Sequence, residues 1–372
     1  MRLLFWSSLS LIFFAYGGYP IWMYCRARLW PHPIWRAIIF PQVSIVLAVR
    51  NEEKHLSAKL ANLAALDYPA DRVEVIVVSD GSTDATNKIL AGWKSCNHRT
   101  LFLPEHHGKA AALNHGVAEA RGEIIVFTDA RQMIASDALK NLVADFADPS
   151  VGCVSGELVI SENPNTPSTH GVGMYWRLEK KIRDWEGLTG SSVGATGAFY
   201  AVRKHLFSTL PPETILDDVY IPLQVVRQGQ RVVLERLALA WDDFVPSVKQ
   251  EFRRKVRTLA GNYQLLQLTP WVVTHSNPVR FQFVCHKVLR LFVPFALLGL
   301  FVSTMWLRKG VYEVALGFQL AFYALAILSA PRAQVGIVSR LSNISLAFLV
   351  LNAAAAIAFL YFITGRKAAW AR

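Results

Sequence analysis

Four long stretches of the sequence contain no charged side chain, and they restrict the fold more than any other feature. They are residues 3–25, 291–307, 314–331 and 341–365 of the 372-residue chain. About 20 helical residues cross the roughly 30 Å hydrocarbon core of a bilayer, and about 17 to 25 are tolerated. The sequence therefore predicts a membrane protein. One transmembrane anchor is expected in residues 1–28 and about three transmembrane helices in residues 279–372.

The first apolar stretch is predicted to remain attached as an anchor. A secretory signal peptide is the alternative, but the stretch is long and no small-x-small cleavage pattern follows it. Arg26 and Arg28 follow directly, and basic residues flank membrane helices preferentially on the cytoplasmic side. We therefore expect a multi-pass protein of the cell (inner) membrane whose next domain is cytoplasmic.

Hydropathy and charge disagree on the number of C-terminal spans. Hydropathy favours four spans in total. With a cytoplasmic domain, four spans would place Arg308, Lys309 and the three basic residues of the tail 366–372 on the outer side, against the usual charge bias. Three spans, with residues 291–307 lying in the membrane interface, would bring these five residues inside. We take four spans as the expectation.

The net charge of +12 belongs to the two ends of the chain. Residues 1–40 hold four basic and no acidic side chains, residues 281–372 hold nine basic and one acidic, and residues 41–280 hold 26 of each. The middle domain is therefore neutral, which argues against nucleic acid as a partner. The basic ends are typical of segments that flank membrane spans and face anionic lipid.

Residues 41–268 have the pattern of an α/β domain. Residues 43–49 and 73–79 are rich in Val and Ile, and each run is followed by a turn and a helical pattern. An alanine-rich helix is expected within 107–122, with another apolar strand at 123–129. Strands that alternate with helices indicate a mostly parallel sheet covered by helices on both faces.

Carboxylates follow three of these strands. The first strand leads to Glu52 in "RNEE", the second to Asp80 in "SDGSTD", and the last to Asp129 in "FTDARQ". Because ligands of such sheets bind at the carboxyl ends of the strands, a polar cleft is expected there. Arg131 stands two positions after Asp129, where a second carboxylate would be expected for a metal site. His106 and His107 are expected to be surface loop residues.

Three later segments carry further candidates. The glycine-rich "GATGAFYAV" (194–202) lets the backbone approach a ligand closely. The helix expected at 215–229 begins with Asp217 and Asp218, a position that the helix dipole favours for acids. The segment 249–268 is basic at its start and apolar at its end. A polar, proline-rich loop at 161–169 precedes all three.

The motifs "LAVRNEE", "VSDGSTD", "FTDARQ" and "LDDVYIP" occur in this order and are followed by an arginine-rich helix and apolar segments. In this order they resemble the family 2 glycosyltransferases, in particular the membrane-integrated branch that includes cellulose, chitin and hyaluronan synthases. The resemblance covers residues 43 to about 268. It implies a GT-A fold, a nucleotide sugar as donor, and Mg²⁺ or Mn²⁺ as cofactor.

The resemblance also implies roles on the donor side of the site. Asp80 corresponds to the acid that contacts the base or ribose, and Lys109 to a lysine near the nucleotide. Asp129 corresponds to the first Asp of the family's Asp-x-Asp, which reaches the metal on the donor diphosphate. Glu52 is grouped with these nucleotide-sugar-binding residues.

On the acceptor side, Gly194, Thr196 and Gly197 match the family's acceptor loop, together with Asp217. Asp218 takes the place of the catalytic base. Arg257 falls where the family's Gln-x-x-Arg-Trp motif places an arginine on the leaving diphosphate. Chemically, an arginine can grip two phosphate oxygens, and one carboxylate can remove the acceptor proton in a single inverting displacement.

Structural alternatives exist for several of these residues. Asp80 could form an Asx-turn or cap the helix after "GSTD", and Asp217 and Asp218 could serve only as acids at a helix N-terminus. Lys109 could act only at the start of its own helix. The basic cluster at 253–257 could face lipid rather than a substrate.

Two departures from the family pattern concern the product and the metal. The Gln and Trp positions of Gln-x-x-Arg-Trp hold Arg254 and Thr258, and the loss of that Trp argues against processive synthesis. Arg131 replaces the second acid of Asp-x-Asp. A hard cation can keep waters and take its other oxygens from the diphosphate, so Asp129 alone is expected to suffice.

With this resemblance, the sequence predicts an inverting glycosyltransferase that uses a UDP-sugar as donor. Its acceptor is expected to be a hydroxyl of a lipid-linked or polysaccharide substrate in cell-surface polysaccharide synthesis. Membrane lipid and other membrane proteins of that synthesis are the expected partners. Two alternatives are a polyprenyl-phosphate sugar transferase, whose acceptor is already an anion, and an inactive transferase-fold subunit of a synthase complex.

Overall fold

The computed structural model describes residues 1–94, 97–160, 169–242, 248–328 and 337–365. The proline-rich loop expected at 161–169 lies almost entirely outside the described residues. The basic tail residues Arg366, Lys367 and Arg372, which bear on the expected number of spans, also lie outside the described residues.

The N-terminal half of the domain forms the expected parallel sheet. Its strands lie in the order β3-β2-β1-β4, and all three pairings are parallel. The strands are β1 (Val43–Val49), β2 (Val73–Asp80), β3 (His98–Leu103) and β4 (Ile124–Thr128). The Val- and Ile-rich runs at 43–49 and 73–79 thus form strands at the predicted positions.

Helices cover both faces of this sheet because its strands are apolar on both sides. Ile45 and Leu47 of β1 pack in the same core as Leu60 of α3 (Leu56–Ala64). Val46, between them, packs with Leu113 of α5 (Lys109–Glu119) on the opposite face. The alternation of side chains along a strand therefore divides the domain into two hydrophobic cores.

The C-terminal half extends the sheet with mixed directions. Strand β7 (Phe199–Arg203) runs antiparallel to β4 and to β6 (Val151–Ile160), and β8 (Arg231–Asp242) runs parallel to β6. The short β5 (Met133–Ile134) pairs antiparallel with β8 and completes the order β3-β2-β1-β4-β7-β6-β8-β5. The α/β class is confirmed, and the sheet is mixed rather than parallel throughout.

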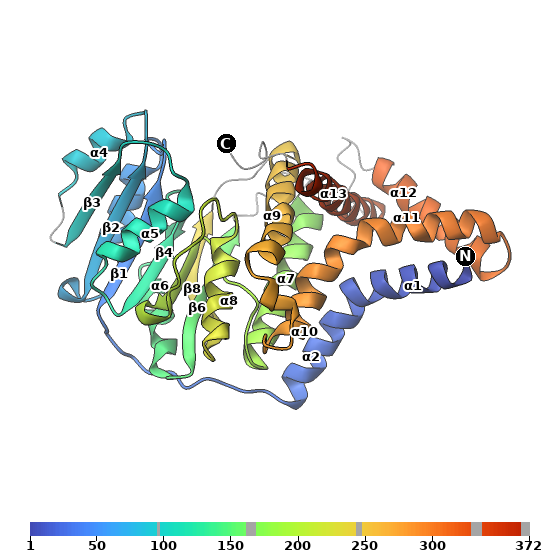
Figure 1. Ribbon diagram of the computed structural model, residues 1–372, viewed down its shortest axis with the longest axis horizontal. Coiled ribbons are helices and arrows are strands. Elements are labelled where there is room, and N and C mark those ends of the chain that lie inside the picture. Colours follow the sequence, from blue (N-terminus) through green and yellow to red (C-terminus); the bar gives the residue numbers. More distant parts are fainter. Residues whose placement is uncertain (95–96, 161–168, 243–247, 329–336, 366–372) are drawn as a thin grey trace.

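The remaining helices of this part connect the strands or lead toward the apolar helices (Figure 1). Helix α7 follows the proline-rich segment, α8 starts at the paired acids, and α9 holds the basic cluster. Their bounds are α4 (Thr86–Gly92), α6 (Ala138–Ala144), α7 (Thr169–Leu188), α8 (Asp217–Arg227) and α9 (Val248–Leu268), with short 3₁₀ turns η2 (Ala70–Arg72), η3 (Asp145–Ala147), η4 (Lys204–Leu206) and η5 (Pro270–Val273).

The apolar segments form helices beside the sheet domain (Figure 1). Three continuous helices in the described part of the chain are long and apolar enough to cross a membrane: residues 2–29, 280–307 and 341–363. Helix α12, in the stretch expected as a further span, is shorter. The elements are α1 (Arg2–Phe13), η1 (Phe14–Gly18), α2 (Tyr19–Leu29), α10 (Arg280–Phe283), η6 (Val284–Val288), α11 (Leu289–Leu307), α12 (Val311–Leu328) and α13 (Ile337–Ile363).

A buried polar network joins these helices to the sheet domain. The Tyr19 hydroxyl, on α2, donates a hydrogen bond to Glu186 of α7. His286, in the π-helical turn η6, lies 2.8 Å from Glu186 Oε1 through Nδ1 and 2.8 Å from Glu179 Oε1 through Nε2. His286 and Glu186 are fully buried. The network therefore ties two membrane-type helices to the same face of α7.

Candidate active site

Asp80 ends β2 and is buried, with its carboxylate occupied by the loop before α5. The carboxylate accepts hydrogen bonds from the backbone N–H groups of His107 and Gly108, at 2.8 and 2.9 Å, and lies 2.6 Å from His106 Nδ1. The carboxylate that accepts from the start of α4 is that of Asp84, whose Oδ1 lies 2.9 Å from the Thr86 nitrogen. Asp80 therefore holds the loop that leads to Lys109.

The glycine after Asp80 is needed for this arrangement. Gly81 has φ +61°, and a Cβ at this position would lie 2.6 Å from the backbone nitrogen of His106. A larger residue would therefore be strained and would push the 105–106 backbone away. The two histidines are surface residues as expected. The hydrogen bond of His106 to Asp80 was not predicted, since nothing in the sequence relates two residues 26 positions apart.

Glu52 lies on the loop after β1 and contacts neighbouring loops. Its carboxylate is 3.0 Å from His55 Nδ1, and its backbone N–H donates to the Thr86 hydroxyl at 2.8 Å. These contacts join the segments that follow β1 and β2. Its assignment to nucleotide-sugar binding stays a prediction.

Lys109 brings two of the predicted acids together at the start of α5. Its Nζ lies 3.1 Å from Asp129 Oδ1 and 3.3 Å from Asp217 Oδ1. Partial burial lowers the pKa of Lys109, but Asp129, Asp217 and Asp218 raise it more, so the net shift is upward and the side chain is positively charged. Asp217 also accepts a hydrogen bond from the Tyr200 hydroxyl at 3.2 Å. This contact explains Asp217 better than a helix-terminal role alone.

A buried lysine donates hydrogen bonds to the turn that carries Asp129. Lys59 of α3 has no exposed surface, and its Nζ donates to the Thr128 hydroxyl at 2.9 Å and to the Gln132 carbonyl at 2.6 Å. Burial lowers the pKa of Lys59 to about 7, although Asp129 opposes this. Sequence reasoning did not single out Lys59, because a lysine in an amphipathic helix is ordinarily a surface residue.

Arg131 points to a different carboxylate than Asp129. Its Nη2 lies 2.7 Å from Asp242 Oδ2 at the end of β8, and Gln132 Nε2 donates to the same oxygen at 2.9 Å. The side chain of Arg131 thus pairs with Asp242 at the end of β8. The residue fixes the turn after Asp129 to β8.

Asp218 lies beside the glycine-rich loop at 194–197. The Ala195 backbone N–H donates to the Asp218 carbonyl at 2.7 Å, and a Cβ on Gly197 would lie only 3.0 Å from Asp218 Oδ2. Gly194 also lies close to α8, with Val219 Cγ2 3.2 Å from a Cβ built there. Small residues are thus required here so that the Asp218 carboxylate can lie against the loop.

The electrostatic surroundings of Asp218 favour the protonated carboxyl. Burial and the neighbouring Asp217 raise the pKa of Asp218, while Lys109, Arg183 and Lys287 oppose the shift, and the net pKa is about 6. A carboxylate with a pKa just below neutrality is still mostly ionised at pH 7. Such a group can accept a proton during a reaction, as a general base must.

Arg183 of α7 was missed by the sequence analysis. Its Nη1 donates to the Thr196 hydroxyl at 3.1 Å and to the Ala195 carbonyl at 3.4 Å. The Thr196 N–H in turn donates to the Ser155 hydroxyl at 2.9 Å. The position of the loop at 194–197 therefore depends on α7 and β6, which carry none of the recognised motifs.

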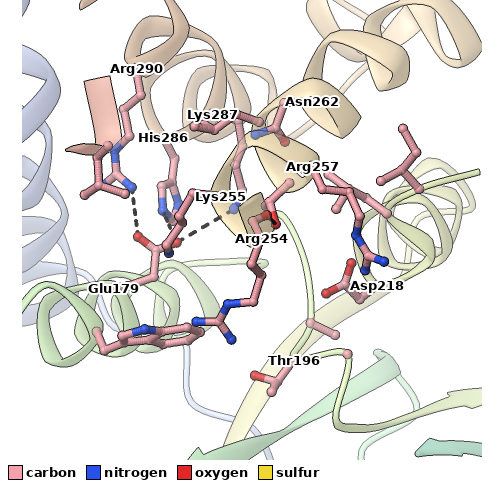
Figure 2. Close-up of a pocket in the computed structure, with 18 of the residues that line it drawn as sticks. Glu179, Thr196, Asp218, Arg254, Lys255, Arg257, Asn262, His286, Lys287 and Arg290 are labelled. Carbon is pink, nitrogen blue, oxygen red and sulfur yellow. Dashed lines mark hydrogen bonds and ion pairs between the residues drawn. The ribbon is translucent and has the colours of Figure 1, made fainter. Parts of the chain in front are cut away.

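One pocket of about 270 Å³ unites most of the predicted residues. The predicted residues that line it are Lys109, Thr196, Gly197, Asp217, Asp218 and Arg257. Asp129 reaches this group through Lys109, whereas Asp80 and Glu52 are not among the lining residues. Arg257 of α9 is exposed and, among the described residues, pairs with no carboxylate. Figure 2 shows Asp218 and Arg257 on the same side of the pocket.

The described residues contain no group of three or more His, Cys, Asp or Glu side chains placed to hold a metal ion. The only cation between Asp129 and Asp217 in the described part of the site is the Lys109 ammonium. Asp129, whose side chain is 41% exposed, offers one hard oxygen ligand on the open side of the sheet edge. Mg²⁺ commonly binds through one or two carboxylates plus substrate phosphates. The residues present fit that mode of binding.

Comparison with known sequences identifies the family of the domain. Residues 44–210 match glycosyl transferase family 2. The poly-beta-1,6-N-acetyl-D-glucosamine synthase of Staphylococcus aureus (strain COL) is 26% identical over 230 residues, which cover 60% of this chain and 55% of the synthase. The corresponding synthase of Staphylococcus epidermidis is 26% identical over 235 residues, covering 62% and 56%. The chain thus spans about half the length of the curated relatives it matches.

A solved structure extends the similarity over nearly the whole chain. The mannosyltransferase PcManGT from Pyrobaculum calidifontis, in complex with GDP-Man and Mn²⁺, has a TM-score of 0.74 and covers 98% of this chain and 100% of its own. Its sequence identity of 23% means that this likeness shows the shared fold. The chain thus has a segment that matches glycosyl transferase family 2, within a domain of the GT-A fold that is joined to apolar helices of membrane-spanning length.

Proposed function

We propose that the protein is a membrane-bound inverting glycosyltransferase. It moves a sugar from a nucleotide-diphosphate donor, a UDP-sugar, to a hydroxyl of a lipid-linked or polysaccharide acceptor in cell-surface polysaccharide synthesis. The observation that carries the proposal is the half-buried Asp218 carboxylate. It lies in one pocket with Lys109 and Arg257, and its pKa is raised to about 6.

The proposed reaction is one direct displacement. Asp218 takes the proton of the acceptor hydroxyl as its oxygen attacks the anomeric carbon from the face opposite the leaving group. The bond between the anomeric carbon and the phosphate oxygen breaks, and the nucleoside diphosphate leaves with the bonding electrons. General-base assistance of this kind contributes about 10²- to 10⁴-fold in rate. A single displacement inverts the anomeric centre.

The cationic residues of the pocket are suited to the charge that develops on the leaving diphosphate. Arg257 is exposed and can bind two phosphate oxygens at once. Lys109 is positively charged and lies between Asp129 and Asp217. Both side chains are already in place before the reaction, so little reorganisation is needed in the transition state.

We assign Asp129 as the ligand of Mg²⁺ or Mn²⁺ on the donor diphosphate. The assignment is supported by the exposed carboxylate at the end of β4 and by the Mn²⁺ in the solved mannosyltransferase of the same fold. When bound, the ion would supply positive charge to the leaving group. Asp80 would act on the nucleotide side by holding the loop that leads to Lys109.

The proposal places the catalytic domain on the cytoplasmic side of the cell membrane. Arg26 and Arg28 occupy the last turn of α2, where the first apolar helix ends and the chain leads to β1. The relatives named as poly-beta-1,6-N-acetyl-D-glucosamine synthases support a role in polysaccharide synthesis. We propose that this synthesis supplies the cell surface and involves other membrane proteins.

The direct test uses membranes that contain the full chain and radiolabelled UDP-, GDP- and dTDP-sugars, with and without EDTA. We expect chelator-sensitive transfer from a UDP-sugar to a lipid-extractable or polymeric product, and loss of that transfer in Asp218→Asn. Transfer that continues in Asp218→Asn would instead favour a polyprenyl-phosphate acceptor, which has no proton to remove. Binding of a nucleotide sugar without any transfer or hydrolysis would favour the inactive subunit.

A further inference from the structure

The pocket has a second, strongly cationic end that the proposed reaction does not use. Arg254 and Lys255 of α9, Lys287 of η6 and Arg290 of α11 all line it. Figure 2 shows Glu179, His286 and Arg290 on the side opposite Asp218 and Thr196. The pocket is thus polarised, with the proposed base at one end and a group of basic residues, here called the basic end, at the other.

The described lining of the basic end includes four basic side chains and one carboxylate, that of Glu179. Glu179 Oε2 lies 2.8 Å from Arg290 Nη1, and Glu179 Oε1 lies 3.7 Å from Lys287 Nζ. Glu251 Oε2 lies 2.8 Å from Arg254 Nη2, and its Oε1 lies 3.7 Å from Lys255 Nζ. His286 also contacts Glu179. Glu179 and Glu251 thus each contact at least two basic side chains.

Trp176 of α7 brings two of these cations together. Its ring lies 5.5 Å from Arg254 Cζ and 5.1 Å from Lys255 Nζ. Burial lowers the pKa of Lys255, Glu251 opposes this, the nearby Arg254 adds to it, and the net pKa is about 8. Two positively charged side chains therefore lie against one ring, beside the carboxylate of Glu251. Such a cluster of charges away from bulk water favours the binding of an anion.

Polar groups without partners also line this pocket. Asn262 of α9 is 7% exposed, and its Oδ1 has no hydrogen-bond partner among the described residues. The buried Trp176 Nε1 likewise has none in the part of the chain that the structure describes. Buried polar atoms are nearly always hydrogen-bonded in folded proteins. These two groups therefore point to a polar ligand in the pocket.

The pocket is lined by the membrane-type helices as well. Tyr16 of η1 and Leu351, Asn352 and Ala355 of α13 are among its lining residues. Two of the basic residues, Lys287 and Arg290, lie in the apolar helical segment 280–307 itself. A ligand that occupies the basic end therefore lies where an apolar tail can enter the membrane region.

From this arrangement we propose that the basic end binds the phosphate group of a lipid-linked sugar, so that the acceptor is an anionic glycolipid rather than the neutral end of a polysaccharide. The proposal rests on the proposed function for the role of Asp218, and it narrows the acceptor to one chemical class. The sugar hydroxyl lies toward Asp218, and the phosphate lies toward Arg254, Lys255 and Lys287.

The test measures binding of farnesyl diphosphate to the detergent-purified full chain by the quenching of intrinsic tryptophan fluorescence, with UDP and Mg²⁺ kept at saturation. Farnesol and inorganic pyrophosphate are measured in parallel. We expect farnesyl diphosphate to bind in the presence of UDP and more tightly than either control ligand. Arg254→Gln and Lys255→Gln should each weaken this binding by about tenfold, because each removes a charge-assisted hydrogen bond.

The matched control is Arg253→Gln, which changes the exposed neighbour of Arg254 on α9 that does not line the pocket. This variant should bind farnesyl diphosphate like the unmodified protein. Equal weakening by Arg253→Gln would mean that only surface charge attracts the ligand, and it would overturn the proposal. Displacement of farnesyl diphosphate by UDP would assign the basic end to the donor, and equal binding of pyrophosphate would exclude a lipid site.

The outcome does not depend on turnover, so it is separable from the proposed function. Farnesyl diphosphate binding without any transfer from a nucleotide sugar would refute the enzymatic proposal and keep the lipid phosphate site. Transfer from a UDP-sugar without farnesyl diphosphate binding would do the reverse. Thermal unfolding of each variant identifies a substitution that has only damaged the fold. If both variants are folded, weaker farnesyl diphosphate binding in both Arg254→Gln and Lys255→Gln supports the lipid phosphate site, and unchanged binding in both refutes it.

Discussion

The pH dependence of sugar transfer offers a quantitative test of Asp218 as the base. Its pKa is raised to about 6 by burial and by Asp217, against the opposing effects of Lys109, Arg183 and Lys287. A base must be ionised to act. With a pKa of about 6, the ionised fraction is about nine-tenths at pH 7 and about one-tenth at pH 5. We therefore expect kcat/KM to rise about tenfold from pH 5 to pH 7 and to level off above it.

Two charge changes should move this curve in opposite directions. Asp217→Asn removes a negative neighbour that raises the pKa of Asp218, so the midpoint should move to lower pH. Arg183→Gln removes a positive neighbour that lowers this pKa, so the midpoint should move to higher pH. Initial rates of radiolabel transfer at saturating metal and donor, measured from pH 4.5 to 8.5, give both midpoints.

The Asp218→Asn variant fixes the baseline for these curves. The amide cannot take a proton, so turnover should fall by about 10²- to 10⁴-fold and the residual rate should be independent of pH. Donor binding, measured by the KM for the nucleotide sugar, should change little. A flat profile in the unmodified protein, or identical midpoints in the Asp217 and Arg183 variants, would refute the reasoning.

Three further tests, two of them with a comparison variant, concern the residues around the proposed base. Asp129→Ala should abolish metal-dependent sugar transfer, whereas Arg131→Ala should only weaken it. Activity measured across a Mn²⁺ titration checks both. Unchanged activity in Asp129→Ala would refute the assignment of Asp129 as the metal ligand. Lys59→Met leaves the buried Gln132 carbonyl without its donor and should lower the free energy of unfolding by about 1–3 kcal/mol. Lys54→Met, which changes an exposed lysine, should leave the free energy of unfolding unchanged. Equal thermal midpoints for the two variants would contradict this. Gly197→Ala should displace the base and lower kcat by about 10²-fold with an unchanged thermal midpoint, and full activity would show that the close approach is not required.

The sequence was sufficient to predict the sheet edge that carries the donor-side residues. Runs of Val and Ile that are buried on both faces have few other structures available, so β1 and β2 were found at their positions. Asp80 and Asp129 then follow from the rule that parallel strands end at one edge. The antiparallel insertion of β7 was not predicted, because its residues were read as a glycine-rich loop.

The residues that position the site were harder to find. Lys59, Arg183 and His106 act through contacts with residues that lie 13 to 73 positions away in the chain. Periodicity and local motifs carry no information on such contacts. The sequence shows that Arg131 replaces the second acid of the Asp-x-Asp motif. Its pairing with Asp242 could not be predicted, because no motif marks the strand β8 that carries Asp242.

The buried contacts of Tyr19, Glu186 and His286 have a consequence for how substrates arrive. Rotation of the sheet domain about the apolar helices would break this network and leave buried polar groups without partners, at a cost of about 1–3 kcal/mol for each group. The catalytic pocket therefore keeps one height and one orientation relative to the helices. An enzyme built in this way cannot reach out for its acceptor. If the acceptor is the lipid-linked sugar proposed above, it must diffuse to the pocket within the plane of the bilayer, and the local density of that lipid would then set the rate of the reaction.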